Sequence, residues 1–370
     1  VKEIPVQYTR KQIFEFAESE LLAIENELKA PGTNEYGRVD RVAGWFLLAR
    51  MYLNAQTWIN ENKYQEAYTY ATKVIADGHY PLASDYREIF LADNNTCKEI
   101  IWPLVQDGLR AQSSAGTNFY VKTFVNGPMD ELYKTGVGSR GWGNVRAKVS
   151  LVDAFDADDV MFDGNDTWGN NKKDKRAQFM TALPNQVKDT WDVNMDMTST
   201  FTCGYGYIKW RNVTKEDELS ASGDAYTSID FPLFRTADAY LMAAEAILRG
   251  ASGTQSEALG YVNEVRTRAY MSGKYAKSGV RSDVSGEISA NELDLDFLLL
   301  ERQKELASEL IRRTDLIRFG KYTKGNNWDW KNGVRLGEDV DDKYNLFPIP
   351  ESELTNNPTL VQNDGYKVIK

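Results

Sequence analysis

The sequence predicts a mainly helical protein in which tetratricopeptide-like helical hairpins form a scaffold around a long, irregular insertion. Two parts of the chain, 39–76 and 235–270, carry paired helical stripes of apolar residues. Between them, over 104–230, this periodicity is lost, and Gly, Asn, Asp, Ser and Thr dominate. The third observation is a highly charged segment at helical spacing, Phe297–Tyr322, around which we expect the other elements to pack.

The N-terminal part begins with a helix that we predict over Arg10–Leu28. Its apolar side chains share one face: Ile13, Phe14, Ala17, Leu21, Ile24 and Leu28. The linker Ala30–Gly37 then breaks the helix with one Pro and two Gly. Two further helices are predicted over Val39–Asn54 and Tyr64–Ala76. Their alternating small and large residues, and the Tyr-x-x-Ala start of the second helix, are typical of a tetratricopeptide hairpin.

The same pattern returns downstream, with helices predicted over Arg235–Arg249 and Ser256–Tyr270. Because the two hairpins are far apart in sequence, we predict a discontinuous scaffold and not a tandem array. The chain then divides into an N-terminal tetratricopeptide-like part (1–104), a loop-rich insertion (105–230) and a C-terminal helical part with a wrapping tail (231–370), all in one compact unit. Binding residues tend to lie on long irregular segments, so the insertion is the candidate ligand-binding region.

The segment Phe297–Tyr322 is predicted to be a helix that ends near Gly320. Apolar residues at helical spacing are Leu299, Leu306 and Leu310, and glutamates at successive i,i+4 positions are Glu301, Glu305 and Glu309. The glutamates could be the acid and base of a glycosidase, or members of a structural ion-pair network. Nearby arginines favour ionised carboxylates and work against a proton donor, so we expect the network. These arginines are Arg302, Arg312, Arg313 and Arg318.

Composition excludes several classes of function. The chain has 54 Asp and Glu against 44 Lys and Arg and no dense basic run, so no nucleic-acid partner is expected. His79 is the only histidine, which argues against a Ser/His/Asp triad and a multi-histidine zinc site. Cys97 and Cys203 neither demand nor exclude one disulfide. No apolar run approaches the roughly 18–20 residues of a membrane span.

The tail Tyr344–Lys370 contains three prolines and is expected to be an ordered, irregular wrap. Its motif FPIPESELTNNPTLVQNDGY resembles the closing motif of the SusD/RagB family, surface glycan-binding lipoproteins of Bacteroidota outer membranes. Three other segments resemble that family in the expected order: Tyr64–Phe90, Phe231–Ala246 and Glu301–Tyr322. Four separated motifs in register make the resemblance specific over nearly the whole chain.

The resemblance implies a binder and not an enzyme. Family members carry tetratricopeptide-like helices, are lipidated at the outward-facing surface of the outer membrane, and cap a TonB-dependent SusC-like transporter. They capture oligosaccharides, usually on aromatic side chains from loops. They also begin with a signal peptide, a lipidated Cys and more than a hundred residues of helix before a segment like Val1–Leu28. We therefore expect the lipid anchor to lie outside this chain.

Two tryptophans of the insertion fit the chemistry of a sugar site. A sugar ring stacks its apolar face on an aromatic ring, and its hydroxyls bond to polar side chains. In SRGWGNVRAK, Trp142 lies between glycines that allow close approach, and it is flanked by Arg140, Asn144 and Arg146. In DGNDTWGNN, Trp168 stands beside Asn170. For each tryptophan, stacking on a ligand, packing within the loop and contact with the transporter all stay open.

Tyr207 is a further candidate ligand contact, although the segment GYGYIKW alternates like a strand. That alternation favours packing for the aromatic residues in and near it: Trp191, Tyr205, Tyr207 and Trp210. The acidic run Asp153–Asp166 suggests calcium, because hard oxygen ligands cluster there. It lacks the spacing of an EF-hand, so no cofactor is expected, and the run is either another kind of calcium site or a solvated acidic loop.

We therefore predict a cell-surface protein that captures oligosaccharides without cleaving them and delivers them to a SusC-like transporter. The alternative is a tetratricopeptide-type adaptor that grips a peptide, which would need polar and charged residues on the concave faces of the hairpins. A glycoside hydrolase is the third and weakest hypothesis, because arginines surround Glu301, Glu305 and Glu309.

Overall fold

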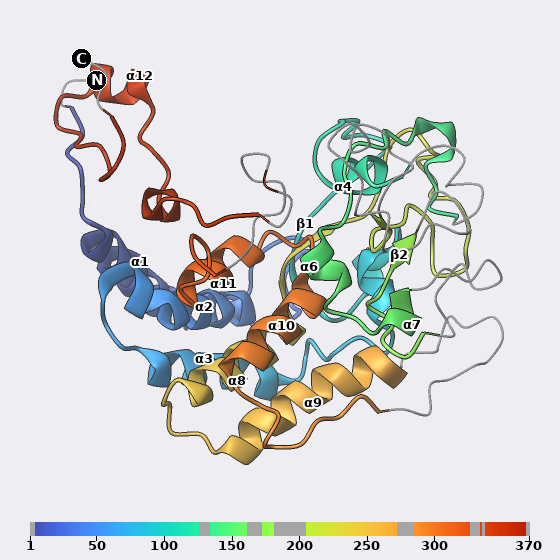
Figure 1. Cartoon of the computed structure of the whole chain (residues 1–370), viewed down its shortest axis with the longest axis horizontal. Helices are drawn as coiled ribbons and strands as arrows, with labels where there is room; N and C mark the ends of the chain where they lie inside the picture. Colours follow the sequence, from blue (N-terminus) through green and yellow to red (C-terminus); the bar gives the residue numbers. More distant parts are fainter. Residues whose placement is uncertain are drawn as a thin grey trace.

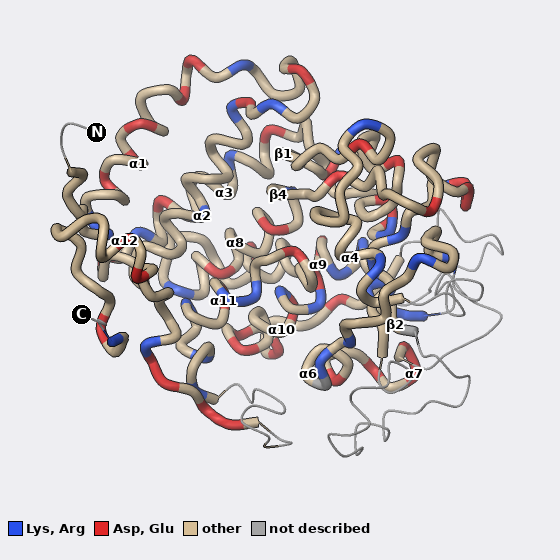
Figure 2. Tube along the Cα trace, turned by 90° about the horizontal axis from the view of Figure 1, so that it is seen from above, with Lys and Arg blue, Asp and Glu red and all other residues tan. Residues whose placement is uncertain are grey.

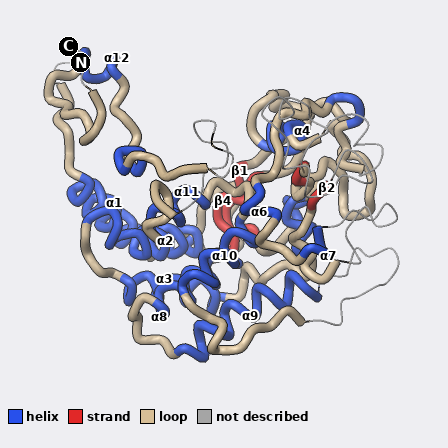
Figure 3. Tube along the Cα trace, viewed as in Figure 1, coloured by secondary structure: helices blue, strands red, loops and turns tan. Residues whose placement is uncertain are grey.

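A computed structural model of the chain describes residues 4–125, 134–160, 172–180, 205–271, 285–325, 334 and 337–367. Figure 1 shows long helices on one side of the molecule and loops with short elements on the other. Figure 3 shows the same division, because the loop-rich half carries only short helices and two-stranded ribbons in the described ranges. The predicted mainly helical fold is confirmed.

The scaffold consists of five long helices, each packed on the next in the order in which they occur in the chain. They are α1 (Arg10–Ile24), α2 (Arg41–Ile59), α3 (Tyr64–Asp77), α8 (Thr236–Leu248) and α9 (Gln255–Met271). α1 packs on α2, α2 on α3, α3 on α8 and α8 on α9. The two hairpins predicted from the sequence therefore stack directly on each other through α3 and α8, although the whole insertion separates them in the chain.

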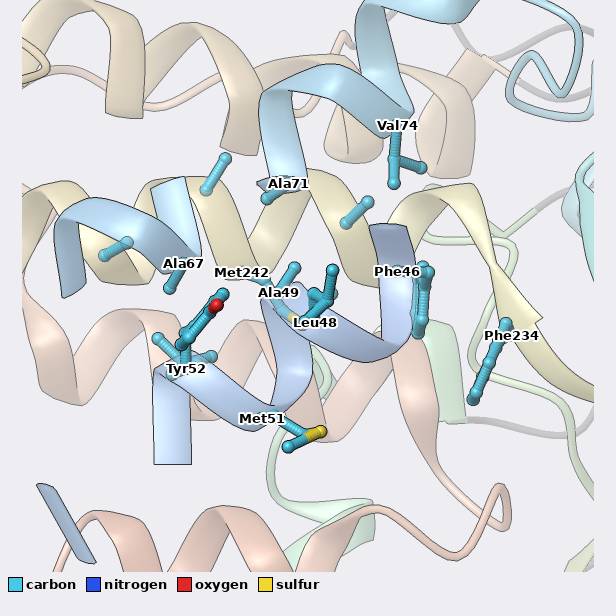
Figure 4. Close-up of a cluster of buried hydrophobic side chains, with 14 of the residues drawn as sticks. Phe46, Leu48, Ala49, Met51, Tyr52, Ala67, Ala71, Val74, Phe234 and Met242 are labelled. Atoms are coloured by element: carbon cyan, nitrogen blue, oxygen red, sulfur yellow. The ribbon is translucent and has the colours of Figure 1, made fainter. Parts of the chain in front are cut away.

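Small residues allow these helices to approach closely. Figure 4 shows Ala67, Ala71 and Val74 of α3 on the side of that helix that faces the core. At one edge of this core, the rings of Phe46 and Phe234 stack with their centroids 4.6 Å apart. All five side chains are buried, so this layer excludes water and contributes apolar burial to stability.

The helix ends follow local capping rules. α1 starts with a capping box between Thr9 and Gln12, and α2 starts at Asp40, whose carboxylate accepts from the backbone N–H of Ala43. α2 extends beyond the predicted Asn54 and stops at Asn60, which has φ 57°. A left-handed residue is a common helix terminator, and Asn tolerates it better than most residues.

Two short antiparallel ribbons complete the described structure. β1 (Ile100–Leu104) pairs with β4 (Phe231–Arg235), with Ile100 opposite Arg235 and Leu104 opposite Phe231. β2 (Phe179–Met180) pairs with β3 (Gly206–Tyr207). Because β1 precedes the insertion and β4 follows it, the chain leaves the scaffold and returns to it at the same ribbon.

The predicted helix Phe297–Tyr322 is wrong in one respect, because it is broken in the middle. α10 spans Leu295–Leu306 and α11 spans Arg312–Arg318. Between them, Ser308 and Leu310 take left-handed conformations with φ 62° and 63°, and Leu310 is 75% exposed instead of facing the core. Such a residue costs roughly 1–2 kcal/mol. The break turns Glu309 inward, where its carboxylate pairs with Lys209 and Arg235.

Replacing Leu310 by Gly is expected to raise the free energy of unfolding by about 0.5–1 kcal/mol, because Gly adopts a positive φ without strain. Urea unfolding followed by circular dichroism measures the change. The matched control is Leu310→Ala, which removes the exposed side chain but keeps the strained conformation. Equal stability of the Gly and Ala variants would show that the left-handed conformation carries no cost.

The remaining elements are short. They are η1 (Tyr86–Phe90), η2 (Asn94–Thr96), α4 (Thr117–Thr123), η3 (Gly138–Arg140), α6 (Val149–Val152), α7 (Ala157–Val160), η7 (Asp342–Asn345) and α12 (Glu351–Asn356). The tail is tied to the N-terminal segment, since Asn357 and Thr359 both donate to the carbonyl of Pro5. Pro5 therefore lies beside the residues that follow α12. In the ranges that the model describes, no helix is long and apolar enough to cross a membrane.

A buried ion-pair network holds the two halves together. We call it the glutamate network, and its carboxylates are Glu99, Glu301, Glu305 and Glu309. Glu305 pairs with Arg176, Arg235 and Arg268, and Glu301 pairs with Arg176 and Arg266. The predicted structural role of the three i,i+4 glutamates is confirmed. Their partners are arginines and Lys209 from distant segments, however, and not the arginines next to them in the sequence.

The glutamate network also speaks against the glycosidase hypothesis. Burial by itself would raise the pKa of Glu305, but the guanidinium groups of Arg268 and Arg235 outweigh burial and hold that pKa well below its usual range. An ionised carboxylate cannot donate a proton to a leaving group at neutral pH. Glu301, Glu305 and Glu309 are each less than 5% exposed, so a polysaccharide cannot reach them.

Candidate functional site

Two of the predicted site residues, Arg140 and Trp142, line the same hollow on the surface of the loop-rich half. This Trp142 hollow has a volume of about 390 Å³. Its lining comes from three separate segments: Ser114, Lys122, Ser139, Arg140, Gly141, Trp142, Ala225 and Tyr226. Lys122 of this lining belongs to α4, which Figure 1 shows on the side of the molecule away from α1 and α2.

Backbone hydrogen bonds place Trp142 against the end of α4. The N–H groups of Trp142 and Gly143 donate to the carbonyls of Lys122 and Val125, at 2.7 and 2.9 Å. The N–H of Asn144 donates to the carbonyl of Thr123 at 2.8 Å. The last carbonyls of a helix have no partner within it, so the segment that carries Trp142 satisfies them. Gly143 has φ 59°, which explains a glycine at that position.

Aromatic rings give the Trp142 hollow an apolar side. The Trp142 side chain is 38% exposed, and its ring lies 6.3 Å from the ring of Phe119 at an angle of 67°. Phe119 is itself exposed. Tyr226 contributes a second lining ring. An edge contact with Phe119 holds the indole in place and leaves part of it accessible to a ligand.

Two cations face the same space. Lys122 is 5% exposed and donates to the carbonyl of Ala225 at 2.5 Å. Its Nζ lies 6.0 Å from the Trp142 ring and 5.9 Å from the Tyr226 ring. Burial lowers the pKa of Lys122, and the nearby Arg140 lowers it further. Arg140 is oriented by Asp224, with Nε 3.0 Å from a carboxylate oxygen.

The other predicted residues are not in this hollow. Asn144 is exposed but does not line the hollow. Its backbone N–H donates to Thr123, as given above. Trp168 and Asn170 lie outside the described residues. Arg146 lines a different pocket, between α6 and α10.

Tyr207 requires a correction. Its side chain is 1% exposed, and its ring packs 5.2 Å from that of Phe179 in a core cluster. The hydroxyl donates to the carbonyl of Arg176. A buried ring cannot stack on a sugar, so Tyr207 is a core residue and not a ligand contact. The packing role favoured by the alternating sequence is confirmed for Tyr205, Tyr207 and Trp210, all of which are buried.

Sequence reasoning missed Lys122, Phe119 and Tyr226. Lys122 and Phe119 lie on α4, and Tyr226 lies in a turn just before β4. The sequence carries no spacing that would connect these segments to Trp142, because only the hydrogen bonds at the end of α4 bring them together. The only local signal was the segment NFYVK, residues 118–122, whose apolar and basic residues indicate a short amphipathic helix that carries Phe119 and Lys122.

The calcium hypothesis stays a prediction. Within the described ranges, no group of three or more His, Cys, Asp or Glu side chains could hold a metal ion. The carboxylate of Asp159, in the acidic run, accepts hydrogen bonds from the backbone N–H groups of Lys173 and Asp174. Residues 161–166 of the run lie outside the described residues.

Comparison with known proteins gives a consistent family. The model of the SusD family matches residues 98–366. Starch-binding protein SusD of Bacteroides thetaiotaomicron is 32% identical, and the alignment covers 99% of this chain and 67% of that protein. SusD-like protein P25 of Formosa agariphila is 25% identical, with 89% of this chain and 59% of that protein covered.

Solved structures show the same fold. Surface glycan-binding protein A from Bacteroides thetaiotaomicron, solved in complex with laminarihexaose, superimposes with a TM-score of 0.65 at 22% identity. That likeness covers 97% of this chain and 72% of the solved one. A SusD-like protein from Bacteroides fragilis gives a TM-score of 0.67 at 20% identity, over 98% of this chain and 72% of the other.

Starch-binding protein SusD, the relative that is 32% identical, is named as a binding protein, in agreement with the expectation of a binder and not an enzyme. The family predicted from the four motifs is confirmed as well. Since the family model matches most of the chain and SusD is 32% identical along almost all of it, this protein belongs to the SusD family.

Proposed function

We propose that this protein captures an oligosaccharide in the Trp142 hollow and delivers it to a SusC-like TonB-dependent transporter on the outward-facing surface of the outer membrane. The observation that carries the proposal is a partly exposed tryptophan ring next to Lys122 and Arg140 in one surface hollow. The ring can stack on the apolar face of a sugar, and the two cations can donate hydrogen bonds to its hydroxyls.

Relatives support the ligand class. One relative is named a starch-binding protein, and a solved structure with this fold holds laminarihexaose. Both ligands are chains of neutral sugars, so an aromatic surface with a few hydrogen-bond donors is chemically sufficient to bind them. The delivery step and the place at the cell surface rest on membership of the family, in which such proteins cap a transporter.

Titration calorimetry with maltohexaose, laminarihexaose and a panel of plant, fungal and host oligosaccharides tests the capture step. Trp142→Ala is expected to weaken binding of the preferred glycan at least about tenfold, or roughly 1.4 kcal/mol, because the stacking surface is lost. The matched control is Trp142→Phe, which keeps a ring and should stay within about threefold of the unchanged protein. Circular dichroism checks that both variants are folded.

Two results would contradict the capture proposal. One is equal affinity of the unchanged protein and Trp142→Ala for a glycan that binds. The other is no binding to any member of the panel by the folded protein. The delivery step has a separate test, namely association with a SusC-like transporter reconstituted in a bilayer, with bovine serum albumin as the control protein.

A tetratricopeptide-type peptide adaptor is the second candidate, and one observation favours it. A groove of about 770 Å³ lies between α1, α2, α11 and the segment before α12. Its lining includes Ile13, Trp58 and Phe347, together with Arg10 and Arg313. An extended or helical peptide with apolar and acidic side chains would fit this chemistry. If the folded protein binds no glycan of the panel, peptide binding in this groove becomes the favoured function.

A further inference from the structure

A second, smaller pocket lies between the loop that follows Trp142 and the broken C-terminal helix. This Arg312 pocket has a volume of about 220 Å³. Phe124 and Leu151 line one side, and Leu306 and Leu316 line the other. Figure 1 shows α6 next to α10, in agreement with this lining. The Arg312 pocket shares no lining residue with the Trp142 hollow, so it is a separate site.

The polar part of the lining is strongly basic. Arg146, Lys148, Arg302 and Arg312 all line the Arg312 pocket, whereas Asp315 is its only acidic lining residue in the described part of the chain. Asp315 is already engaged, since its carboxylate pairs with Arg302 and with Arg318, each at 2.8 Å. Arg302 is engaged as well, by Asp238 and Asp315, so an anion that entered the pocket would first be attracted by Arg312.

Arg312 differs from the buried arginines around it. Its Nη1 donates to the carbonyl of Leu299 at 2.9 Å and its Nη2 to the side-chain oxygen of Gln303 at 2.8 Å, and both acceptors are neutral. The structure gives Arg312 no carboxylate partner within the described ranges, whereas Arg176 and Arg302 each pair with several.

This arrangement leaves a partly buried cation with no carboxylate in contact in the described structure. Burial lowers the pKa of the Arg312 guanidinium to about 10. The negative charge of Asp315 raises this pKa, and the positive charge of Arg302 lowers it further. A desolvated charge with no opposite charge in contact is costly, and a bound anion would remove that cost. Guanidinium groups bind carboxylates with particular strength, because they offer a planar fork of donors.

We propose that the Arg312 pocket binds a small ligand with one carboxylate, which pairs with Arg312 while the apolar walls cover the body of the ligand. A volume of about 220 Å³ is below the roughly 300–1,000 Å³ of sites for drug-sized molecules, so the pocket suits one group of monosaccharide size and not an oligosaccharide. The carboxylate can come from a uronic acid sugar or from a free organic acid. This inference does not depend on the function proposed for the Trp142 hollow.

Calorimetry with sodium D-glucuronate, D-glucose and sodium acetate tests the proposal and separates the two sources. We expect glucuronate to bind at least tenfold more tightly than glucose, and to bind more weakly as the salt concentration rises. Tighter binding of glucuronate than of acetate supports a uronic acid, and equal binding supports a free acid. Arg312→Gln should weaken glucuronate binding at least tenfold, and Arg312→Lys should restore part of the loss.

A second pair of variants leaves the Arg312 hydrogen bonds intact. Ser150 lines the Arg312 pocket and is exposed, so Ser150→Asp puts a competing carboxylate at its edge. We expect Ser150→Asp to weaken glucuronate binding at least tenfold, and its matched neutral control, Ser150→Asn, to bind like the unchanged protein. Three outcomes would overturn the proposal: no binding of glucuronate or acetate at 20 mM or below, equal binding of glucose, or unchanged binding in both Arg312→Gln and Ser150→Asp.

Discussion

Replacing Arg235 by Met is expected to lower the free energy of unfolding by about 3–5 kcal/mol, the cost of breaking a buried network by removing one partner. Arg235 is 1% exposed and pairs with Glu99, Glu305 and Glu309 at 2.8, 2.6 and 2.7 Å. Met fills a similar volume but brings no charge. Three buried carboxylates would lose a cation, and Glu309 would keep only Lys209 as a charged partner in the described structure.

Urea unfolding at pH 7, followed by circular dichroism, measures this loss. The matched control is Arg38→Met, because Arg38 forms an exposed ion pair with Glu35 at 3.0 Å, with 70% of its side chain accessible. Exposed pairs of this kind contribute little, so the control should change stability by less than about 1 kcal/mol. If Arg235→Met unfolds at the same urea concentration as Arg38→Met, the glutamate network does not hold the fold.

The position of Arg235 explains why a large effect is expected. It is the last residue of β4, where the chain returns from the insertion to the scaffold. The glutamate network also takes Arg176 and Lys209 from the insertion and Arg268 from α9. Figure 2 shows basic and acidic positions close to one another around α10 and α11, in the middle of the molecule. Buried ion pairs therefore fix the loop-rich half, and with it the Trp142 hollow, on the helical scaffold.

The scaffold could be predicted from the sequence because its signals are local. The apolar stripe of α3 repeats at the helical period, and α3 ends one residue beyond the predicted Ala76. The role of Glu301, Glu305 and Glu309 was equally visible from their i,i+4 spacing. Their ion-pair partners could not be predicted. Those partners lie on other elements, and ion pairs between distant segments have no regular spacing in the sequence.

The candidate site was predictable only in part, for the same reason. Trp142 and Arg140 stand within one glycine-containing segment, so their proximity could be seen in the sequence. Lys122 and Tyr226 join them only through the fold. The prediction of Tyr207 as a ligand contact was wrong, although the alternation of its segment favoured packing, because alternation alone does not tell which side of a strand faces water.

Acid is expected to destabilise the protein, because two buried acids have pKa values well below their ordinary ones. Burial by itself would raise the pKa of Glu245, but Arg318 outweighs it, and the pKa falls to about 2. Burial is likewise outweighed at Asp238 by Arg302 and Arg50, and the pKa of that group also falls to about 2. Ordinary values for these groups are 4.5 and 3.8.

The sign of the effect follows from these values. In the unfolded chain the two acids take up protons near pH 4, whereas in the folded protein they stay ionised down to about pH 2. Their contribution is therefore complete above about pH 5 and is lost as the pH falls towards 2, by roughly 2–4 kcal/mol for each group. Urea unfolding at pH 7, 5, 4 and 3 should give a free energy of unfolding that falls steeply below pH 5.

Glu245→Gln separates this linkage from a general loss of stability in acid. At pH 7 the variant should be less stable than the unchanged protein, because Arg318 loses the carboxylate that its Nε and Nη2 each contact at 2.7 Å. Between pH 5 and pH 3 it should lose less stability, because one acid with a lowered pKa has been removed. Parallel curves for the two proteins over this range would show that Glu245 does not bind protons differently in the folded and unfolded states. The acid sensitivity would then come from other carboxylates, of which Glu305, with its lowered pKa and three arginine partners, is the next to replace.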